Sequence, residues 1–271
     1  MLPGRSGNVE VRPAHAVGEL AQECAGGDRA AERVRAQDRG RRRDGEPLAY
    51  ILGEREFWSL RLEVAPATLI PRPETELLVE LALQRGPAGA TARVLELGTG
   101  SGAIAAALAS ERPGWGITAT DNSHAALALA KRNFARLGLG NVRPLPGDWY
   151  AALPRGEHFD LILSNPPYVA RDDPHLQQGD LPWEPRDALV AGPDGLDAIR
   201  VIGAGAPAHL APGGWLLLEH GCEQGPAVRS ILRGAGLCQV ASERDLAGLE
   251  RVSLGRAPGP DPVSSRAPTF A

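Results

Sequence analysis

The sequence predicts an α/β protein with a doubly wound, mainly parallel sheet. From Arg93 onward, short apolar runs alternate with stretches of helical character, which is the pattern of repeated strand–helix–strand units. The first of these runs leads into a glycine-rich turn and then into a helix, an arrangement typical of nucleotide-type loops. With 271 residues and 43% hydrophobic content, the chain can bury one core and still carry a small appendage.

Residues 1–46 are expected to form this N-terminal appendage, helical or partly disordered. They are rich in arginine and carboxylates and poor in large aliphatic residues, so they lack the apolar face that a packed helical domain needs. The run Arg39–Arg43 is interpreted as a solvated helix end in preference to an RNA or ribosome contact. A misassigned leader is the alternative interpretation of the whole segment.

Residues 47–76 are expected to connect the appendage to the main domain. β-favouring residues around Phe57–Leu62 predict a short hairpin-like element. Pro71–Glu76 then opens a helix, because an early proline and early carboxylates favour a helix start and leucines follow at helical spacing. The main domain is predicted to span residues 77–256, and the Pro-, Ser- and Gly-rich tail 257–271 to be disordered.

The first strand of the main domain, Val94–Leu97, runs into a glycine-rich turn and then into the helical stretch Ala103–Ser110. The glycines let the backbone approach a ligand closely, and the helix presents free N–H groups. Glu96 would repel a pyrophosphate, but it could accept from an ammonium group or orient the loop. S-adenosylmethionine, which has an ammonium group and no phosphate, therefore fits better than NAD. The predicted cofactor-binding residues here are Glu96, Leu97, Gly98, Thr99 and Gly100.

The second strand, Ile117–Thr120, ends at Asp121, about 20 residues beyond the glycine-rich turn. Dinucleotide folds carry at this place the carboxylate that binds ribose hydroxyls. Asp121 is therefore predicted to bind the ribose of the cofactor, and a turn or cap role is the alternative. Asn122 or Ser123 is expected to cap the amphipathic helix that follows and continues to about Leu137.

The third strand, near Val142–Leu145, carries prolines that a sheet accepts only at its edge. It is followed by Gly147, Asp148 and Trp149, which place a carboxylate and an indole at one end of the sheet. Asp148 is predicted to accept from the adenine amino group of the cofactor, and Trp149 to pack against the adenine ring. A buried core tryptophan after a turn is the alternative for Trp149.

The fourth strand, Phe159–Leu163, runs into Ser-Asn-Pro-Pro-Tyr, the most informative motif in the chain. An amide or ring-amino nitrogen is a poor nucleophile because its lone pair is delocalised, so the protein must hold it. The side-chain carbonyl of Asn165 and the backbone carbonyl of Pro166 can accept the two hydrogens of one NH2 group. Tyr168 supplies a flat face against the planar group. A proline-rich turn that closes a strand is the alternative.

This motif predicts methyl transfer to a planar nitrogen. The candidate catalytic residues are Asn165, Pro166 and Tyr168. Asn165 is also expected to contact the cofactor, and substrate contacts are expected from Asn165, Pro166, Pro167 and Tyr168.

The remaining strands are predicted at Trp215–Glu219, Leu237–Ala241 and Arg251–Leu254. Glu219 and His220 lie at the end of the first of these, but no proton need leave before methyl transfer, so a general base is not the favoured role for them. His175 lies in the long loop after Tyr168, where a turn hydrogen bond is favoured over a substrate contact.

The global properties exclude several classes of function. The cysteines Cys24, Cys222 and Cys238 have no metal-like spacing and leave an odd thiol, so neither a disulfide scaffold nor a metal site is expected. No apolar run reaches the length of a membrane span and no signal peptide is recognisable, which favours the cytoplasm. A net charge of −4 favours a protein substrate over nucleic acid. A monomer is expected.

Together these residues resemble the HemK/PrmC family of protein-glutamine N5-methyltransferases. The resemblance covers about Glu46 to Arg256 and includes a Pro-Arg-Pro-Glu-Thr-Glu element that does not accompany Asn-Pro-Pro-Tyr in DNA adenine-N6 methyltransferases. Besides Glu96–Gly102 and Asn165–Tyr168, it rests on Pro47–Gly53, Arg55–Trp58, Pro71–Glu76, Asp173–Gly179 and Leu218–Gly221.

The resemblance implies a class I S-adenosylmethionine-dependent methyltransferase fold, whose seven-stranded sheet has the order 3-2-1-4-5-7-6 with an antiparallel last strand. It implies methylation of the glutamine in the Gly-Gly-Gln motif of peptide-chain release factors, giving N5-methylglutamine and S-adenosylhomocysteine without a metal. The family also carries a leucine-rich N-terminal domain that helps to grip the release factor, and residues 1–46 are shorter and less apolar than that domain. It places Pro71–Glu76 beside the cofactor, where Arg72 and Glu74 could close over it; a well-capped helix start is the alternative for either side chain.

Three alternative functions remain open. The sister enzymes that methylate a glutamine of a ribosomal protein rank second, because they usually depart from Pro-Arg-Pro-Glu-Thr-Glu. A DNA or RNA adenine-N6 methyltransferase should add a basic region for target recognition and a means to extrude a base. A non-catalytic binding module would be expected to lose some site residues, whereas this chain carries the complete set.

Overall fold

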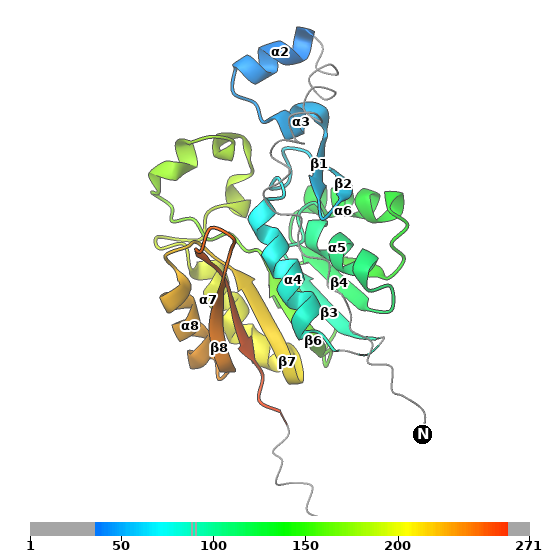
Figure 1. Cartoon of the computed structure of the whole chain (residues 1–271), viewed down its shortest axis with the longest axis vertical. Helices are drawn as coiled ribbons and strands as arrows, with labels where there is room; N and C mark the ends of the chain where they lie inside the picture. The colour runs from blue at the N-terminus through cyan, green and yellow to red at the C-terminus, as the bar shows by residue number, and fades with distance from the viewer. Residues whose placement is uncertain (1–35, 88, 90, 260–271) are drawn as a thin grey trace, which may run out of the picture.

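The computed structural model describes residues 36–87, 89 and 91–259 and contains a seven-stranded sheet (Figure 1). The spatial order of its strands is β5-β4-β3-β6-β7-β9-β8, and β9 runs antiparallel to both of its neighbours. Counted from β3, this is the order 3-2-1-4-5-7-6, so the predicted fold class is confirmed. The strands are β3 (Arg93–Leu97), β4 (Gly116–Asp121), β5 (Val142–Pro146), β6 (Phe159–Ser164), β7 (Leu210–Glu219), β8 (Cys238–Arg244) and β9 (Glu250–Arg256).

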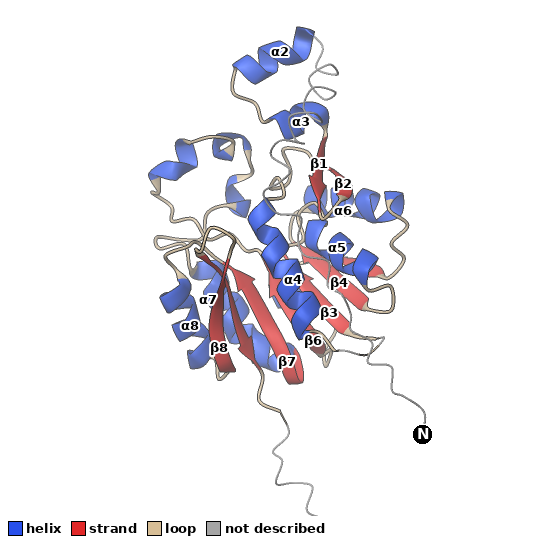
Figure 2. Ribbon diagram, in the orientation of Figure 1, coloured by secondary structure: helices blue, strands red, loops and turns tan. Residues whose placement is uncertain are grey.

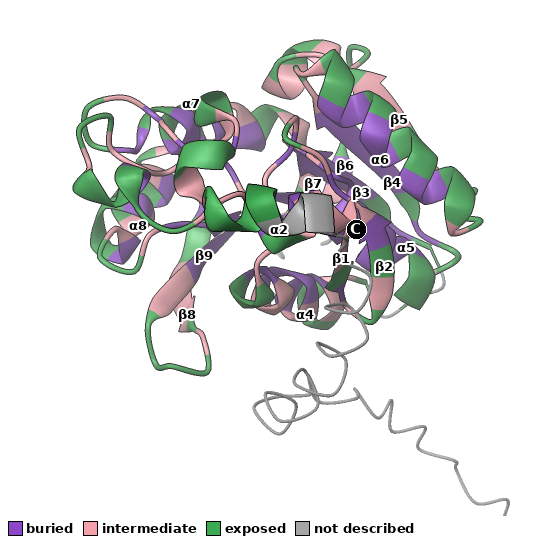
Figure 3. Ribbon diagram, turned by 90° about the horizontal axis from the view of Figure 1, so that it is seen from above, coloured by how far each residue is buried: buried purple, intermediate pink, exposed green. Residues whose placement is uncertain are grey.

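Helices cover both faces of the sheet (Figure 2). One face carries α4 (Glu76–Arg85), α5 (Ala103–Glu111) and α6 (His124–Arg136), and the other carries α7 (Asp197–His209) and α8 (Gly225–Gly234). Figure 3 shows buried and exposed residues alternating along α4 and α6, as in helices with one apolar side. Each helix therefore hides an apolar face against the sheet, which is how strand–helix–strand units form a layered domain.

The central strands contribute alternate residues to two separate cores. In β3, Val94 packs with α4, α5 and α6, whereas Leu95 packs with α7 and α8. In β6, Leu161 and Ile162 divide in the same way. Because both faces of these strands are buried, most of their positions are apolar, which explains their nearly continuous apolar runs.

Strand β5 lies at the edge of the sheet, as its prolines predict. Pro144 and Pro146 lie opposite Ala119 and Asp121 of β4. Because proline has no N–H to donate, an inner strand would lose hydrogen bonds at these positions, whereas an edge strand has a free side.

Strand β7 and the helix after Pro71 begin at residues other than those predicted. Strand β7 begins at Leu210 rather than Trp215, and its pairing with β6 shifts between Phe159 and Leu161. The early part of β7 reads Ala-Pro-Gly-Gly, which is turn-like in sequence and is held by its pairing. The helix predicted to open at Pro71 begins instead as a 3-10 turn at Pro73–Thr75 and continues as α4.

The described N-terminal region contains α2 (Ala36–Arg43), α3 (Leu48–Leu52) and the hairpin of β1 (Glu54–Phe57) and β2 (Leu60–Glu63). Helix α3 departs from the prediction of a hairpin alone. It is a short helix that begins after Pro47 and ends at Gly53, where a φ of 72° favours glycine. Residues 40–43 are exposed, in agreement with a solvated helix end. The disorder predicted for the first residues and for the tail falls largely on residues 1–35 and 260–271, outside the described ranges.

The hairpin is joined to the glycine-rich turn by the buried side chain of Asn133 in α6. Its Oδ1 accepts from Glu63 N at 2.7 Å, and its Nδ2 donates to Glu63 O and Ser101 O at 2.9 Å each. One amide thus ties β2 and the turn to the same helix. Figure 1 shows the hairpin at the same end of the sheet as the long loop after β6.

Two smaller expectations concern the cysteines and the membrane. Cys222 and Cys238 are exposed free thiols, while Cys24 lies outside the described residues. Among the helices that the structure describes, none is long and apolar enough to cross a membrane.

Candidate active site

A cavity of about 520 Å³ lies where the first four strands of the main sheet end. Its walls include the turn after β3, Asp121–Ser123 after β4, Gly147–Trp149 after β5, and Asn165 with Pro167 after β6. From outside the sheet, the lining also includes Ala67, Thr68, Leu69, Pro71, Arg72, Thr75, Pro185, Asp187 and Ala188. The carboxyl ends of neighbouring parallel strands meet here, which is where open α/β sheets bind ligands.

The glycine-rich turn bends tightly at the floor of this cavity. The N–H groups of Gly98 and Thr99 both donate to Thr120 O at 2.9 Å, so the turn is tied to β4. Gly98, Gly100 and Gly102 all have positive φ, between 56° and 84°. A side chain at Gly102 would also lie 2.6 Å from the Phe134 ring, so glycine is needed there for conformation and for space.

Glu96 is a buried carboxylate that orients this turn. Its Oε2 accepts from Thr99 Oγ1 at 2.7 Å and from Ala105 N at 3.1 Å, which connects β3, the turn and the start of α5. Its Oε1 is buried without a hydrogen-bond partner among the described residues. Burial raises the pKa of Glu96 to about 8, against the opposing effect of these donors.

Asp121 holds the other side of the turn. Its Oδ2 accepts from Gly100 N and its Oδ1 from Ser123 N, both at 2.8 Å. Ser123 in turn caps α6, because its Oγ accepts from Ala126 N at 3.2 Å. Burial raises the pKa of Asp121 in spite of these two donors. Each carboxylate oxygen keeps a lone pair for a hydroxyl group in the cavity.

Asp148 and Trp149 line the next part of the cavity. The Trp149 ring also packs against the core of α7 and α8, so it is part of the core and of the cavity wall at once. A Cβ at Gly98 would lie 3.6 Å from this ring, so the indole stands directly over the glycine-rich turn. Asp148 and Trp149 thus line the same cavity as the turn, and their contacts with adenine stay a prediction.

The Asn-Pro-Pro-Tyr motif is divided between the cavity and the protein interior. Asn165 and Pro167 line the cavity, and Asn165 Nδ2 donates to Thr75 Oγ1 at 3.2 Å. Pro166 is buried and Tyr168 donates through its hydroxyl to Glu219 Oε1 at 3.3 Å; neither is among the lining residues. The Leu97 side chain likewise lies in the core of α7 and α8.

The charges of the lining suit a cationic ligand. Among the described residues, its ionisable side chains are the acids Glu96, Asp121, Asp148 and Asp187 and a single base, Arg72. Carboxylates attract a sulfonium or an ammonium group and repel phosphate. The orphaned Oε1 of Glu96 is a further acceptor of the kind that such a ligand would need. The cavity thus fits S-adenosylmethionine better than a nucleotide with a pyrophosphate.

Comparison with known proteins places the chain among methyltransferases. The family model described as methyltransferase small domain matches residues 73–179. The release factor glutamine methyltransferase of Xylella fastidiosa strain Temecula1 is 59% identical over 215 residues, which cover 79% of this chain and 78% of the relative. That of Pseudomonas aeruginosa is also 59% identical, with 80% and 78% covered. The chain belongs to the release factor glutamine methyltransferase family.

Solved structures of methyltransferases share the fold of this family member. A methyltransferase from Pyrococcus furiosus has a TM-score of 0.55 at 23% identity, with 74% of this chain and 90% of that chain covered. A 16S rRNA methyltransferase of T. thermophilus, solved with AdoMet and guanosine, has a TM-score of 0.56 at 22% identity, with 75% and 49% covered. These similarities confirm the class I methyltransferase fold.

Glu184 is a residue of this methyltransferase site that the sequence did not indicate. Its Oε2 pairs with Arg72 Nη2 at 2.6 Å and its Oε1 accepts from Ile70 N at 2.9 Å. The buried carboxylate thereby fastens the long loop after β6 to the segment before η1 (Pro73–Thr75), and both line the cavity. Its partners are more than a hundred residues away in sequence, so no local pattern could reveal it.

Arg72 lines the cavity as expected, whereas Glu74 is exposed and lies outside the lining.

His175 and His220 of this family member have structural partners. His175 is exposed, and its Nδ1 lies 2.7 Å from Asp173 Oδ1, which matches the favoured turn hydrogen bond. His220 is buried between Ser253 Oγ and Gly221 O, both at 2.8 Å, and burial lowers its pKa. Within the described ranges, no group of His, Cys, Asp and Glu could hold a metal ion.

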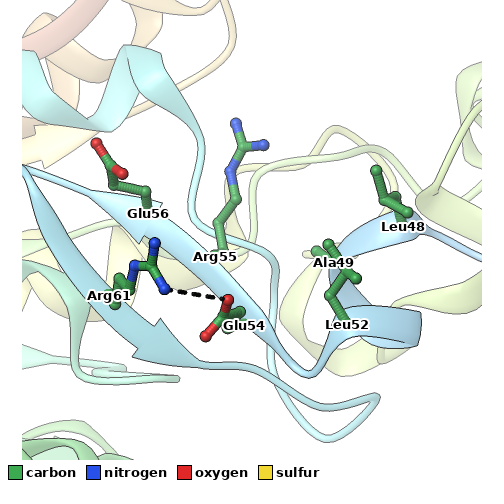
Figure 4. Close-up of a pocket in the computed structure, with 7 residues that line it drawn as sticks. All are labelled: Leu48, Ala49, Leu52, Glu54, Arg55, Glu56 and Arg61. Atoms are coloured by element: carbon green, nitrogen blue, oxygen red, sulfur yellow. Dashed lines mark ion pairs between the residues drawn. The ribbon is translucent and has the colours of Figure 1, made fainter. Parts of the chain in front are cut away.

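A second cavity of about 220 Å³ lies between α3 and the hairpin (Figure 4). Figure 4 shows the apolar side chains of α3 on one side and the charged side chains of the hairpin on the other, with Arg61 paired to Glu54 at 3.7 Å. None of the predicted site residues lines it. The first cavity is therefore the candidate active site of this methyltransferase.

Proposed function

We propose that this protein transfers a methyl group from S-adenosylmethionine to the side-chain amide nitrogen of the glutamine in the Gly-Gly-Gln motif of peptide-chain release factors. The observation that carries the proposal is that Asn165, an acceptor for an NH2 group, lines the same cavity as Asp121 and Glu96. Family membership selects a glutamine amide among planar nitrogens. A cytoplasmic, monomeric enzyme without a metal fits this role, since its substrates act in translation.

Three groups of residues would hold the cofactor. Asp121 would accept from the ribose hydroxyls, Asp148 and Trp149 would bind the adenine, and Glu96 with the glycine-rich turn would receive the amino-acid part. When bound, S-adenosylmethionine supplies an electrophilic methyl carbon: a nitrogen–carbon bond forms as the sulfur–carbon bond breaks, and the amide then loses one proton to water.

The Asn165 side chain and the Pro166 carbonyl would hold the glutamine NH2 group and fix the direction of its lone pair. As the nitrogen gains positive charge, its N–H groups become stronger donors, so both acceptors stabilise the transition state more than the ground state. Tyr168 and Pro166 are not on the cavity wall, so any direct contact from them would come through the backbone or after the loop has moved. Holding two reactants in one orientation supplies a further large part of the acceleration.

The proposal is tested with radiolabelled S-adenosylmethionine and four separate acceptors. These are a release factor, its variant with the Gly-Gly-Gln glutamine changed to alanine, the ribosomal protein that the sister enzymes modify, and duplex DNA. Label should enter only the unchanged release factor. Label in DNA alone, or equal label in both forms of the release factor, would overturn the proposal.

A further inference from the structure

Asn165 is the end of a chain of contacts that leads away from the cavity into the protein. Its Nδ2 donates to Thr75 Oγ1 at 3.2 Å. Thr75 closes η1, is 4% exposed, and also lines the cavity. Its hydroxyl also interacts with Glu219 at the end of β7, which is 1% exposed and accepts from Tyr168 through Oε1. The chain thus connects three elements that are far apart in sequence.

The Thr75 hydroxyl can donate one hydrogen bond. Because its oxygen accepts from Asn165, its own proton is available to another acceptor. The Glu219 carboxylate is close enough for the hydroxyl to favour its charged form, and Glu219 Oε2 is buried with no hydrogen-bond partner of ordinary geometry among the described residues. A buried acceptor without a partner is costly, so a small rotation that lets Thr75 donate to it is favourable.

The direction of this hydroxyl decides which end of the Asn165 amide faces the cavity. If Thr75 donates to Glu219, its hydroxyl oxygen can only accept from Asn165. The Nδ2 of Asn165 then faces Thr75, and its Oδ1 faces the substrate. If Thr75 donated to Asn165 instead, the amide would turn round and present its own NH2 to the NH2 of the glutamine. Only the first arrangement provides the acceptor that the reaction needs.

We propose that Thr75 is a positioning residue that, backed by the buried Glu219 carboxylate, holds the Asn165 amide with its oxygen toward the substrate. The inference rests on the proposed function, because it assigns a role in binding the glutamine amide. It assigns a function to the Pro-Arg-Pro-Glu-Thr-Glu element, because Thr75 of this element contacts Asn165 of the Asn-Pro-Pro-Tyr motif. It also explains why a carboxylate is kept at the buried end of β7.

The ionisation of Glu219 should then be visible in the rate. Burial raises the pKa of Glu219 to about 7, while Thr75, Tyr168 and Arg251 favour its charged form and Glu74 opposes it. The charged carboxylate accepts only, whereas the protonated acid can donate back and release the Thr75 hydroxyl. The rate constant for methyl transfer should therefore rise with pH through about 7.

The test compares Thr75→Val with Thr75→Ser in single-turnover methylation of the release factor. Valine keeps the shape without the hydroxyl, and we expect it to slow methyl transfer by about tenfold, the equivalent of one hydrogen bond. Serine should stay within about threefold of the parent, and S-adenosylmethionine affinity should change by less than that in either variant. Thr118→Val is the matched control, since Thr118 is an equally buried threonine of β4 that does not line the cavity.

Two further measurements separate positioning from a merely structural role. In an Asn165→Ala background, Thr75→Val should have almost no additional effect on the rate, because its route to the substrate is gone. In the otherwise unchanged protein, Thr75→Val should also remove the rise of the methyl-transfer rate near pH 7. Any contribution of Glu96 to this pH dependence is the same in the parent and the variant. A parent-like rate in Thr75→Val, or an equal loss in both backgrounds, would overturn the proposal.

A measurement without substrate keeps this inference separate from the proposed function. The side-chain NH2 signal of Asn165 can be assigned by NMR from its absence in Asn165→Ala. We expect Thr75→Val to shift this signal and to speed its hydrogen exchange, even if no release factor is methylated. An Asn165 signal unchanged by Thr75→Val would overturn the positioning role alone, and a parent inactive on release factors would overturn the proposed function alone.

Discussion

Glu96 illustrates how one buried side chain can have two functions. Its Oε2 joins the glycine-rich turn to the start of α5, while its Oε1 is buried and lacks a protein partner. The sequence allowed either an acceptor for the ligand or an organiser of the loop, and the structure shows the second. The unpartnered oxygen leaves room for the first, so the two roles are compatible and belong to different atoms.

The raised pKa of Glu96 predicts a pH effect on stability. The pKa rises from an ordinary 4.5 to about 8 on folding, so the folded state binds more protons between these values and stability falls as pH rises through this window. Glu96→Gln, which keeps an acceptor oxygen for Thr99 and Ala105, should abolish this fall. We expect its melting temperature to match the parent near pH 5 and to exceed it at pH 9, by about 2–4 °C for each kcal/mol regained. Calorimetric scans of the parent and Glu96→Gln at both pH values test this prediction. Equal melting temperatures of the two proteins at pH 9 would contradict the raised pKa of Glu96.

A second prediction at the residue scale concerns Asp121. Asp121→Ala should weaken S-adenosylmethionine binding by about 1.5–3 kcal/mol, the scale of hydrogen bonds to a charged acceptor. Part of the loss would come from Gly100 N, which donates to Asp121 and would no longer be held. Titration calorimetry measures the affinity, with NAD as the negative control. Unchanged affinity, or tight binding of NAD, would contradict the ribose role.

Asn165 carries the third prediction. Asn165→Ala should change cofactor affinity little and lower kcat by about 10²–10³, as for loss of one preorganised polar group. Asn165→Asp keeps an acceptor but adds a charge that favours the bound sulfonium at least as much as the transition state, in which that charge is spreading. It should bind the cofactor as well as the parent does and react more slowly. Single-turnover rates equal to the parent in both variants would show that Asn165 is only a turn residue.

At the scale of elements, the cavity is closed by two loops that share one buried ion pair. Glu184→Ala should cost about 2–4 kcal/mol of stability, because it leaves Arg72 unpaired and Ile70 N without its acceptor; the value lies at the lower end for buried pairs since Arg72 is partly exposed. Proteolysis within the loop after β6 should become faster. Arg200→Ala, which breaks exposed pairs to Asp194 and Asp197, is the control and should cost less than about 1 kcal/mol. Equal effects of the two substitutions would show that the buried pair does not hold the loops.

The elements show what a local pattern can and cannot predict. The glycine-rich turn, Asp121 and the edge position of β5 follow from neighbouring residues, because turns, caps and proline effects act over a few positions. The inward alternation of β3 also implies that Leu97 points into a core, although it was assigned to the cofactor with its neighbours. Glu184 and the Thr75–Asn165 contact depend on residues brought together by the whole fold, so sequence reasoning could not find them.

On the scale of the whole molecule, we predict that the appendage is separable from the catalytic domain. In its described part, Arg41 Nε of α2 donates to Glu46 of the same segment at 2.7 Å, and α2 contacts α3 of the connector. Deletion of residues 1–43 should therefore leave the melting temperature and S-adenosylmethionine affinity nearly unchanged. If the segment grips the substrate, KM for intact release factor should rise while activity on a short Gly-Gly-Gln peptide stays constant. An equal loss on both substrates would contradict a separable appendage.

The overall strand order could be anticipated only through the family resemblance. Alternating runs predict a doubly wound sheet, but periodicity does not say that β9 inserts between β7 and β8. That choice is made by long-range packing, since Leu217 of β7 and Leu254 of β9 share a core with α4.

This insertion of β9 has a consequence for the moment at which the protein is made. The ribosome synthesises β7 and β8 before β9, but β7 and β8 do not pair with each other in the folded sheet. Both pair with β9, residues 250–256. Until those residues emerge, β7 has a bare edge that can recruit a strand from another nascent chain. A messenger that stops before codon 250 would therefore yield a fragment whose β7 edge is unpaired and prone to aggregate, rather than a slightly shortened enzyme.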